Sequence, residues 1–416
     1  MKRRDFVRYT TLGSTAFLVP AFLKGFERLS NPYLGPIENA YGVSGNKKIL
    51  VVVQLSGGND GLNTVIPYRN DIYYRERPVI GKKENEVLKL NDDLGLNPGM
   101  TALKGLYDDG KLTVINSVGY PNPDRSHFRS MDIWQSASES NQFESTGWIG
   151  RYLDSNCQGA QKPYSAIETD GSLSLAMRGE TRTGIALESP DAYFAMAHDK
   201  YIKAVSERGN SSLLNGTDDI QKEDNLHYLY KTLAESGSSA DYIYKTSRIY
   251  KSTFEYPKGE FGKNLKTIAT LIVSGLDTSV YYISLGGFDT HDQQNQRQDK
   301  LLKEFSDGIG VFTDDLKANN RLRDVVVMTF SEFGRRVSQN ASNGTDHGTA
   351  NNMFIINGNL KKPGIYNDAP DLSNLDNGDL IYKVDFKDVY GEMVGNWLGA
   401  DTEKILYRKN LSMGLI

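Results

Sequence analysis

Two Asp-His pairs in the sequence offer the donor atoms of a metal site. Asp289 and His291 are separated by one residue, and Asp346 is followed directly by His347. A carboxylate oxygen and an imidazole nitrogen together suit Zn²⁺ and similar divalent ions. Each pair also has a plainer interpretation, in which the Asp caps a helix and the His bonds to a backbone carbonyl. Because the chain has only five histidines, two such pairs favour a metal site.

A polar loop offers a hydroxyl group between two arginines. Ser126 lies at the start of a predicted helix, with Arg125 before it and Arg129 after it. The positive potential of a helix N-terminus favours a phosphate or sulfate group, and the arginines could hold anionic oxygens through bidentate contacts. Ser126 could instead simply cap the helix. Glu332 and Arg335 also have two interpretations, either a ligand and an anion clamp or a salt bridge that closes a turn.

The strands that must position these residues are recognisable as apolar runs. The segment 49–55 is continuous and rich in β-branched residues, as expected for a strand buried on both faces of a parallel sheet. Similar runs predict strands over 112–118, 165–168, 279–285, 324–330 and 353–356. Helical patterns alternate with them around 100–107, from about Ser126, over 293–316 and over 386–398. This alternation predicts a mostly parallel sheet with helices on both faces.

The residues that could do chemistry follow the predicted strands. In sheets of this kind, ligands bind outside the carboxyl ends of the strands. Seven such residues come directly after a predicted strand or lie in the loop beyond one: Asp60, Ser126, Asp289, His291, Glu332, Asp346 and His347. They belong to five separate loops, which predicts that they form a single site.

Composition narrows the class of protein. The net charge is −4 and no block of like charges stands out, which argues against nucleic acid as the main partner. Cys157 is the only cysteine, so the chain forms no internal disulfide. Its stability must come from the core, with a bound metal as a further source. Between about residues 189 and 274, Tyr, Leu and Ala recur at helical spacing and predict a helical insertion or cap.

The N-terminus has the features of an export signal. Arg3 and Arg4, then one residue and Phe6, form the motif that the twin-arginine export machinery reads. The uncharged, mostly apolar stretch 9–23 is shorter than the roughly 20 residues of a membrane span, and Pro20 interrupts it. These features predict a signal peptide. The alternative is an amphipathic helix of the mature protein.

These features divide the chain into two parts. Residues 1–40 are assigned to the twin-arginine signal peptide and a linker, and residues 41–416 to one α/β domain that contains the helical insertion. We expect a bacterial protein that is periplasmic or secreted and has the twin-arginine export machinery as a partner. No other segment is long and apolar enough to cross a membrane, so no permanent span is expected.

Six motifs, together with the signal, resemble a known family. They are QLSGGNDGLNTVIPY (54–68), RSHFRSMDIWQSA (125–137), TGWIGRYLD (146–154), LGGFDTHDQQ (285–294), FSEFGR (330–335) and TDHGTANNMFIING (345–358). In this order they resemble the domain-of-unknown-function 1501 family, from the signal to about Gly358 and less distinctly through the C-terminal helix. That family is related to the alkaline phosphatase and sulfatase superfamily. The resemblance implies an alkaline phosphatase-like, three-layer α/β/α sandwich that uses divalent metals to cleave phosphate or sulfate esters.

The resemblance also implies roles for individual residues. Asp60 matches the metal-binding Asp after the first strand, and Ser126 matches the nucleophile at a helix start. The other metal ligands implied are the two pairs, Asp289 with His291 and Asp346 with His347. Two features differ from the superfamily. Its Asp and His are usually further apart than Asp289 and His291 are here, and it supplies a further His ligand near the C-terminus, whereas no histidine follows His347 in this chain. We therefore expect one divalent ion rather than two, with Zn²⁺ or Mn²⁺ favoured.

Three functions remain open at this level. The first is an exported, metal-dependent hydrolase of a small-molecule or glycan-linked phosphate or sulfate ester, in which Ser126 attacks and Arg125 or Arg129 stabilises the equatorial oxygens. The second is an exported binding or assembly protein that keeps the alkaline phosphatase-like fold without catalysis. The third is an esterase of the Gly-Asp-Ser type. It is disfavoured because no Gly-Asp-Ser precedes residues 58–60 and no Asp-x-x-His lies near the C-terminus.

Overall fold

The computed structural model describes residues 48–156, 163–200, 202, 237–409 and 411–416. The predicted signal peptide and linker, Cys157 and the middle of the predicted insertion lie outside these residues. The described parts of the insertion include α7 (Pro190–Ala197) and α10 (Glu260–Val273), and both are helical as expected. In the part of the chain that the structure describes, no helix is both long and apolar enough to span a membrane.

A nine-stranded sheet forms the centre of the molecule. Its order is β11-β5-β10-β9-β1-β8-β6-β7, with β14 paired to β5. The strands are β1 (Ile49–Leu55), β5 (Leu112–Gly119), β6 (Ala166–Glu168), β7 (Ile185–Ala186), β8 (Val280–Leu285), β9 (Val325–Phe330), β10 (Asn351–Ile356), β11 (Gly364–Ile365) and β14 (Val384–Asp385). All six strands expected from the apolar runs are present, with ends that differ by at most two residues.

The sheet is mostly parallel, with one antiparallel strand in the middle. β1 pairs in parallel with β8 on one side and with β9 on the other. β10 runs antiparallel to both of its neighbours, β5 and β9. The beginning of β10 therefore lies at the edge where the parallel strands end. This direction matters for the site, because residues that precede β10 meet residues that follow β1, β8 and β9.

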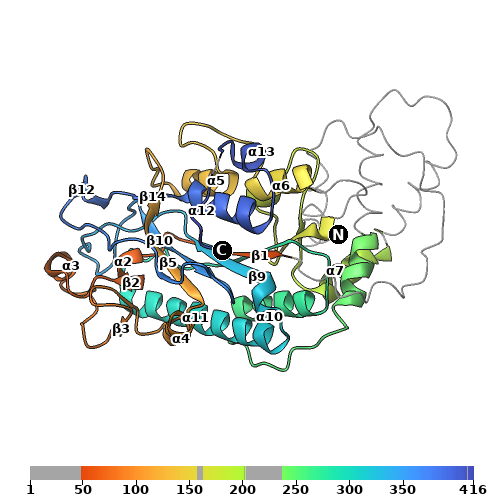
Figure 1. Ribbon diagram of the computed structural model, residues 1–416, viewed down its shortest axis with the longest axis horizontal. Coiled ribbons are helices and arrows are strands. Elements are labelled where there is room, and N and C mark those ends of the chain that lie inside the picture. Colours follow the sequence, from red (N-terminus) through yellow and green to blue (C-terminus); the bar gives the residue numbers. More distant parts are fainter. Residues whose placement is uncertain (1–47, 157–162, 201, 203–236, 410) are drawn as a thin grey trace.

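Helices cover both faces of the sheet, as Figure 1 shows. One face is covered by α5 (His127–Ser136), α6 (Trp148–Asn156), α12 (Phe386–Gly391) and α13 (Thr402–Leu406). The other face is covered by α4 (Thr101–Asp108), α10 and α11 (Gln294–Ala318). The three-layer α/β/α sandwich is thereby confirmed.

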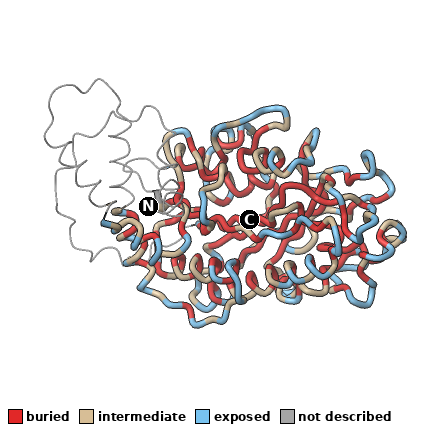
Figure 2. Tube along the Cα trace, turned by 180° about the vertical axis from the view of Figure 1, so that it is seen from behind, coloured by how far each residue is buried: buried red, intermediate tan, exposed pale blue. Residues whose placement is uncertain are grey.

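The alternation of side chains along β1 explains the two cores. Val51 and Val53 belong to one apolar cluster, with side chains of α10 and α11. Leu50 and Val52 point to the opposite face and belong to a second cluster, which includes Trp134 of α5. Figure 2 shows the buried residues running through the sheet and along the helix sides that face it. A strand that is buried on both faces needs the continuous apolar run seen in the sequence.

The last predicted helix, 386–398, differs in its second half. After α12 the chain continues as a π-helix, η5 (Glu392–Trp397). The Glu392 carboxylate accepts the backbone N–H groups of the C-terminal segment, at 2.7 Å from both Met413 and Leu415. This side chain therefore binds the C-terminal segment instead of facing solvent, which the helical periodicity could not show.

Smaller elements border the carboxyl edge of the sheet. The turn after β1 leads into α2 (Gly61–Thr64), and β2 (Val65–Ile66), β4 (Gly95–Leu96) and β3 (Leu88–Lys89) form a three-stranded sheet beside it. The short helix α3 (Asp71–Glu76) also lies in this region. A hairpin of β12 (Leu375–Asp376) and β13 (Asp379–Leu380) lies next to the loop between β9 and β10, because Thr349 donates to the Leu380 carbonyl at 2.5 Å.

Candidate metal centre

Three loops bring polar side chains to one point at the carboxyl edge of the sheet. His127 is the first residue of α5, beyond the end of β5, and Asp289 and His291 follow β8. His347 precedes β10. Glu332, in the loop after β9, bonds to His127. The sequence predicted this convergence, although it did not single out His127.

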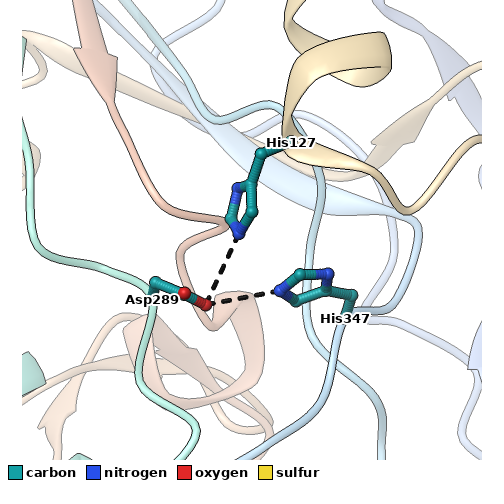
Figure 3. A group of neighbouring side chains, drawn as sticks. All are labelled: His127, Asp289 and His347. Atoms are coloured by element: carbon teal, nitrogen blue, oxygen red, sulfur yellow. Dashed lines mark hydrogen bonds and ion pairs between the residues drawn. The ribbon is translucent and has the colours of Figure 1, made fainter.

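The focus of the group is one carboxylate oxygen, Oδ1 of Asp289. The Nε2 atoms of His127, His291 and His347 lie 3.5, 3.1 and 3.3 Å from it. The Nε2 atoms of His291 and His347 are also only 2.9 Å apart. Figure 3 shows His127, at the start of α5, and His347 pointing toward Asp289 from separate elements. The ligand atoms of these three residues all lie within 4.8 Å of one another, a spacing that could hold a metal ion.

The outer nitrogen of each imidazole is held by an acceptor. Nδ1 of His127 lies 2.8 Å from Oε1 of Glu332, and Nδ1 of His291 lies 3.2 Å from Oδ1 of Asp346. Nδ1 of His347 lies 2.8 Å from the carbonyl oxygen of Arg125. A carbonyl or an ionised carboxylate only accepts, so each Nδ1 carries the proton.

Three Nε2 lone pairs consequently face the same carboxylate oxygen. Lone pairs and an anion at these distances repel one another unless a cation or protons lie among them. Histidines that bind metals show the same arrangement, in which the second ring N–H donates to a carboxylate or a backbone carbonyl and fixes the ring. The residues present therefore fit a divalent ion bound through Nε2.

The electrostatics favour the metal-binding forms of Asp289 and His347, whereas they favour the protonated form of His127. Burial raises the pKa of Asp289, but the hydrogen bond and charge of Arg335, followed by His347 and His291, lower it to about 2. Burial lowers the pKa of His347, which outweighs the opposite effect of the Arg125 carbonyl. The hydrogen bond to Glu332 raises the pKa of His127. At neutral pH, Asp289 is ionised and His347 is neutral, as ligands must be.

Arg335 ties the loops of the site together. Its guanidinium is fully buried, and its Nη2 donates to Oδ1 of Asp289 at 2.6 Å. Its Nε donates to the carbonyl of Gly58 at 2.6 Å, and its Nη1 donates to the carbonyl of Thr345 at 2.9 Å. Of the two interpretations that the sequence left open for Arg335, the structure shows a salt bridge. The partner of this salt bridge is Asp289 rather than Glu332.

Two glycines allow these loops to approach one another. Gly57 has φ +117°, and a Cβ there would lie 2.5 Å from the backbone nitrogen of Asp289. Gly58 has φ +69°, and a Cβ there would lie 2.1 Å from the ring of Phe333. The amide of Gly57 also donates to Oε1 of Glu332 at 2.8 Å. The glycine-rich turn after β1 therefore supports the site through its backbone.

Asp60 has different partners from the other predicted ligands. Its side chain is fully buried and forms a two-pronged salt bridge with Arg77, with Nη1 to Oδ2 at 2.6 Å and Nη2 to Oδ1 at 3.0 Å. Gln294 donates to Oδ2 as well, and the backbone amide of Leu62 donates to Oδ1 at 3.2 Å. Both carboxylate oxygens are thus occupied by protein donors, and the structure does not bring Asp60 into the His-Asp group.

Ser126 lies directly before His127, as the N-cap of α5. It is exposed, and its side chain makes no capping hydrogen bond. Its backbone amide donates to Oδ1 of Asp124 at 2.7 Å. The simple capping role is thus not seen, and Ser126 directly precedes His127 of the candidate metal centre.

The two arginines beside Ser126 are engaged with protein groups. Arg125 forms an ion pair with Asp379 of β13. Arg129 donates to the carbonyls of Ser140 at 2.9 Å and Gln142, and its guanidinium lies 4.0 Å from the ring centre of Phe143. Arg129 therefore fastens the loop after α5, whereas 42% of the Arg125 side chain is exposed.

His127 is the residue that sequence reasoning missed. It lacks a neighbouring Asp, which is the pattern that drew attention to the other histidines. A usable signal was its place in the chain, since it follows Ser126 at a predicted helix start beyond a buried strand. Its acidic partner, Glu332, is 205 residues away and becomes apparent only in the folded chain.

A family model described as "Protein of unknown function (DUF1501)" matches residues 47–415. The chain belongs to the DUF1501 family. The family resemblance predicted from the six motifs is therefore confirmed. Among curated proteins, no sequence is significantly similar to the DUF1501 protein.

Several solved structures share features of this fold. The lipoteichoic acid synthase LtaP from Listeria monocytogenes is 10% identical, with 98% of this chain and 81% of LtaP covered, at a TM-score of 0.38. The PsFucS1 sulfatase from Pseudoalteromonas sp. is 10% identical, with 88% of this chain and 69% of the sulfatase covered, at a TM-score of 0.34. The TAB5 alkaline phosphatase mutant His 135 Glu is 11% identical, with 75% of this chain and 90% of the phosphatase covered, at a TM-score of 0.29. All three scores are below 0.5, so these are distant likenesses that carry no activity over to the DUF1501 protein.

The buried ion pair of Asp60 generates a test of its role. Asp60→Asn leaves the buried guanidinium of Arg77 without a counter-charge, so we expect the free energy of unfolding to fall by about 3–5 kcal/mol. The metal content of the folded protein should stay unchanged. Urea denaturation with elemental analysis measures both, and Asp108→Asn, at an exposed pair with Lys104, is the control with little effect. If Asp60→Asn lost its metal and kept its stability, Asp60 would instead be a metal ligand.

Proposed function

We propose that the protein is a metal-dependent hydrolase of phosphate or sulfate esters. One divalent ion is held by His127, Asp289 and His347, with His291 beside them. The observation that carries the proposal is that three imidazole Nε2 atoms converge on one carboxylate oxygen while each Nδ1 is held by an acceptor. Imidazole nitrogens with one carboxylate oxygen favour Zn²⁺ or Mn²⁺ over Ca²⁺.

Three observations support one ion rather than two. Both oxygens of Asp60 are taken by Arg77 and other protein donors. Arg335 places a fixed positive charge 2.6 Å from Asp289, where a second ion would also have to bind. Among the described residues, His127, Asp289 and His347 form the one group with metal-ligand spacing.

Ser126 is the proposed nucleophile. Its hydroxyl is exposed and free of a capping bond, and the N-terminus of α5 stabilises negative charge on the hydroxyl oxygen and on an incoming anion. A bound divalent ion polarises the ester and favours the ionised hydroxyl. The Ser126 hydroxyl gives its proton to water and Oγ bonds to phosphorus or sulfur. The bond to the leaving oxygen breaks, and this oxygen takes a proton from water and departs as the alcohol. Water then hydrolyses the covalent ester and restores Ser126.

The second candidate function is an exported binding or assembly protein that retains the fold without catalysis. The observation that favours it is the salt bridge between Arg77 and Asp60. The carboxylate of Asp60, the Asp after the first strand, binds a guanidinium instead of a metal ion. The two functions differ in turnover and share metal binding. Activity of the metal-loaded protein toward p-nitrophenyl phosphate and p-nitrophenyl sulfate therefore separates them.

Export through the twin-arginine route belongs to the same proposal, with residues 1–40 as signal peptide and linker and residues 41–416 as the exported domain. The double variant Arg3→Lys, Arg4→Lys keeps the positive charges but loses the pair of guanidinium groups. This variant should stay in the cytoplasm. Cell fractionation measures this, and Lys2→Arg, which leaves the pair intact, is the control. Normal export of the double variant would contradict the twin-arginine assignment.

Metal binding is tested by removing its ligands. The protein loaded with Zn²⁺ or Mn²⁺ should hold one ion per chain. His347→Ala should weaken binding by more than the roughly 10–100-fold that is typical when an outer partner of a ligand is lost. Binding should also weaken as the pH falls, because the imidazoles must be neutral. Elemental analysis and competition with a chelator measure these effects.

The control for this experiment is His198→Ala, whose imidazole lies 3.3 Å from Asp241 and outside the candidate metal centre. It should bind the ion like the unaltered protein. A protein that takes up no ion, or one in which His347→Ala and His198→Ala bind equally well, would refute the metal centre.

The role of Ser126 is tested by Ser126→Ala. This variant should lose most of its turnover of p-nitrophenyl phosphate or sulfate, about 1,000-fold or more, because the nucleophile is gone. Its metal content should not change, and its unfolding free energy should change by less than the ~1 kcal/mol typical of a lost N-cap, since no cap bond exists. Steady-state kinetics and denaturation provide the measurements. Full activity of Ser126→Ala would show that another group attacks.

A further inference from the structure

Two partly exposed arginines share one buried carboxylate beside the candidate metal centre. Arg125 forms an ion pair with Oδ2 of Asp379, and Nε of Arg336 lies 3.5 Å from Oδ1 of the same residue. The side chain of Asp379 is fully buried, whereas those of Arg125 and Arg336 are 42% and 40% exposed. Two guanidinium groups therefore share a single carboxylate, which does not occupy all of their N–H donors.

The backbone fixes both arginines next to the site. The carbonyl of Arg125 accepts from Nδ1 of His347, at 2.8 Å. The amide of Arg336 donates to the carbonyl of Asp346, at 3.0 Å. Their side chains meet at Asp379, on the β12–β13 hairpin. The pair therefore stands at the rim of the loop that presents Asp346 and His347.

Free donors remain on both guanidinium groups. A guanidinium has five N–H groups, and a planar fork of them matches the oxygens of phosphate, sulfate or carboxylate. Arg125 uses Nη2 for Asp379, and Arg336 uses Nη2 for the carbonyl of Asn377, at 3.1 Å. Asp379 holds Arg125 and the Asn377 carbonyl holds Arg336, so a ligand would lose little entropy by ordering them.

Other acids lie nearby and keep their negative charges, so the two arginines are distinguished by their free N–H donors and not by net charge. Asp124 accepts the backbone amide of Ser126. Asp376 accepts from the side-chain amide of Asn377, and its charge raises the pKa of Asp379, after the larger effect of burial. Asp289 is neutralised by Arg335. Arg125 and Arg336 supply the guanidinium donors available to a ligand that reaches beyond the metal centre on this side.

We propose that Arg125 and Arg336 form an anion subsite that binds a second negatively charged group of the substrate. This inference rests on the proposed function, in which the ester group to be cleaved lies at the metal centre. The substrate is then a polyanion, a phosphate or sulfate ester with at least one further phosphate, sulfate or carboxylate group. An ester that carries a single anionic group occupies only the metal centre.

The subsite is tested by binding, which does not depend on turnover. Dextran sulfate is the probe, and uncharged dextran shows what the polymer alone contributes. Arg336→Gln should weaken the binding of dextran sulfate about tenfold and reduce its dependence on salt, because one charged contact is lost. Arg336→Lys keeps the positive charge but lacks the planar fork of N–H donors, so it should bind dextran sulfate with intermediate affinity.

The matched control is Arg248→Gln, which removes the same charge from an exposed pair with Asp191 of α7, at the opposite end of the molecule from β12. It should bind dextran sulfate like the unaltered protein. Equal affinities of Arg336→Gln and Arg248→Gln would overturn the subsite. Binding that depends on Arg336, in a protein that cleaves no ester, would support the subsite and reject the proposed hydrolase.

Discussion

A single buried guanidinium holds the site together. Arg335 donates to carbonyls of the turn after β1 and of the loop before β10, and it forms a salt bridge with Asp289 after β8. A buried charge is costly unless it is paired and fully hydrogen-bonded, so the chain can keep Arg335 inside only if these loops adopt their observed positions. The convergence of the site residues follows from that requirement.

The fixed cation also shapes the chemistry. Asp289 is paired with the guanidinium of Arg335, so the carboxylate is already partly neutralised before an ion binds. A divalent ion in such surroundings keeps more of its positive charge for an anionic ligand than it would beside several free carboxylates. Together with the N-terminus of α5, this favours anionic esters over neutral ones. The free guanidinium donors of Arg125 and Arg336 extend the same preference to the rim of the site.

The sequence predicted those parts of the fold and the site that depend on local pattern. The continuous apolar run of β1 indicated a doubly covered strand, and both Asp-His pairs were recognised from their spacing. The role of Asp60 depends on its buried salt bridge with Arg77, which lies 17 residues later in the chain. No local sequence pattern indicates that this pair is buried. The antiparallel direction of β10 and the Glu332 partner of His127 are likewise set by tertiary packing. Such long-range pairings are not encoded by periodicity, because they depend on which loops meet.

Anomalous X-ray scattering at the absorption edge of the bound metal tests the central claim most directly. Crystals of the protein loaded with Zn²⁺ or Mn²⁺ should show one peak, within about 2.0–2.2 Å of Nε2 of His127, Nε2 of His347 and Oδ1 of Asp289. A peak at Asp60, or no peak at His127, Asp289 and His347 in protein that had taken up the ion, would contradict it.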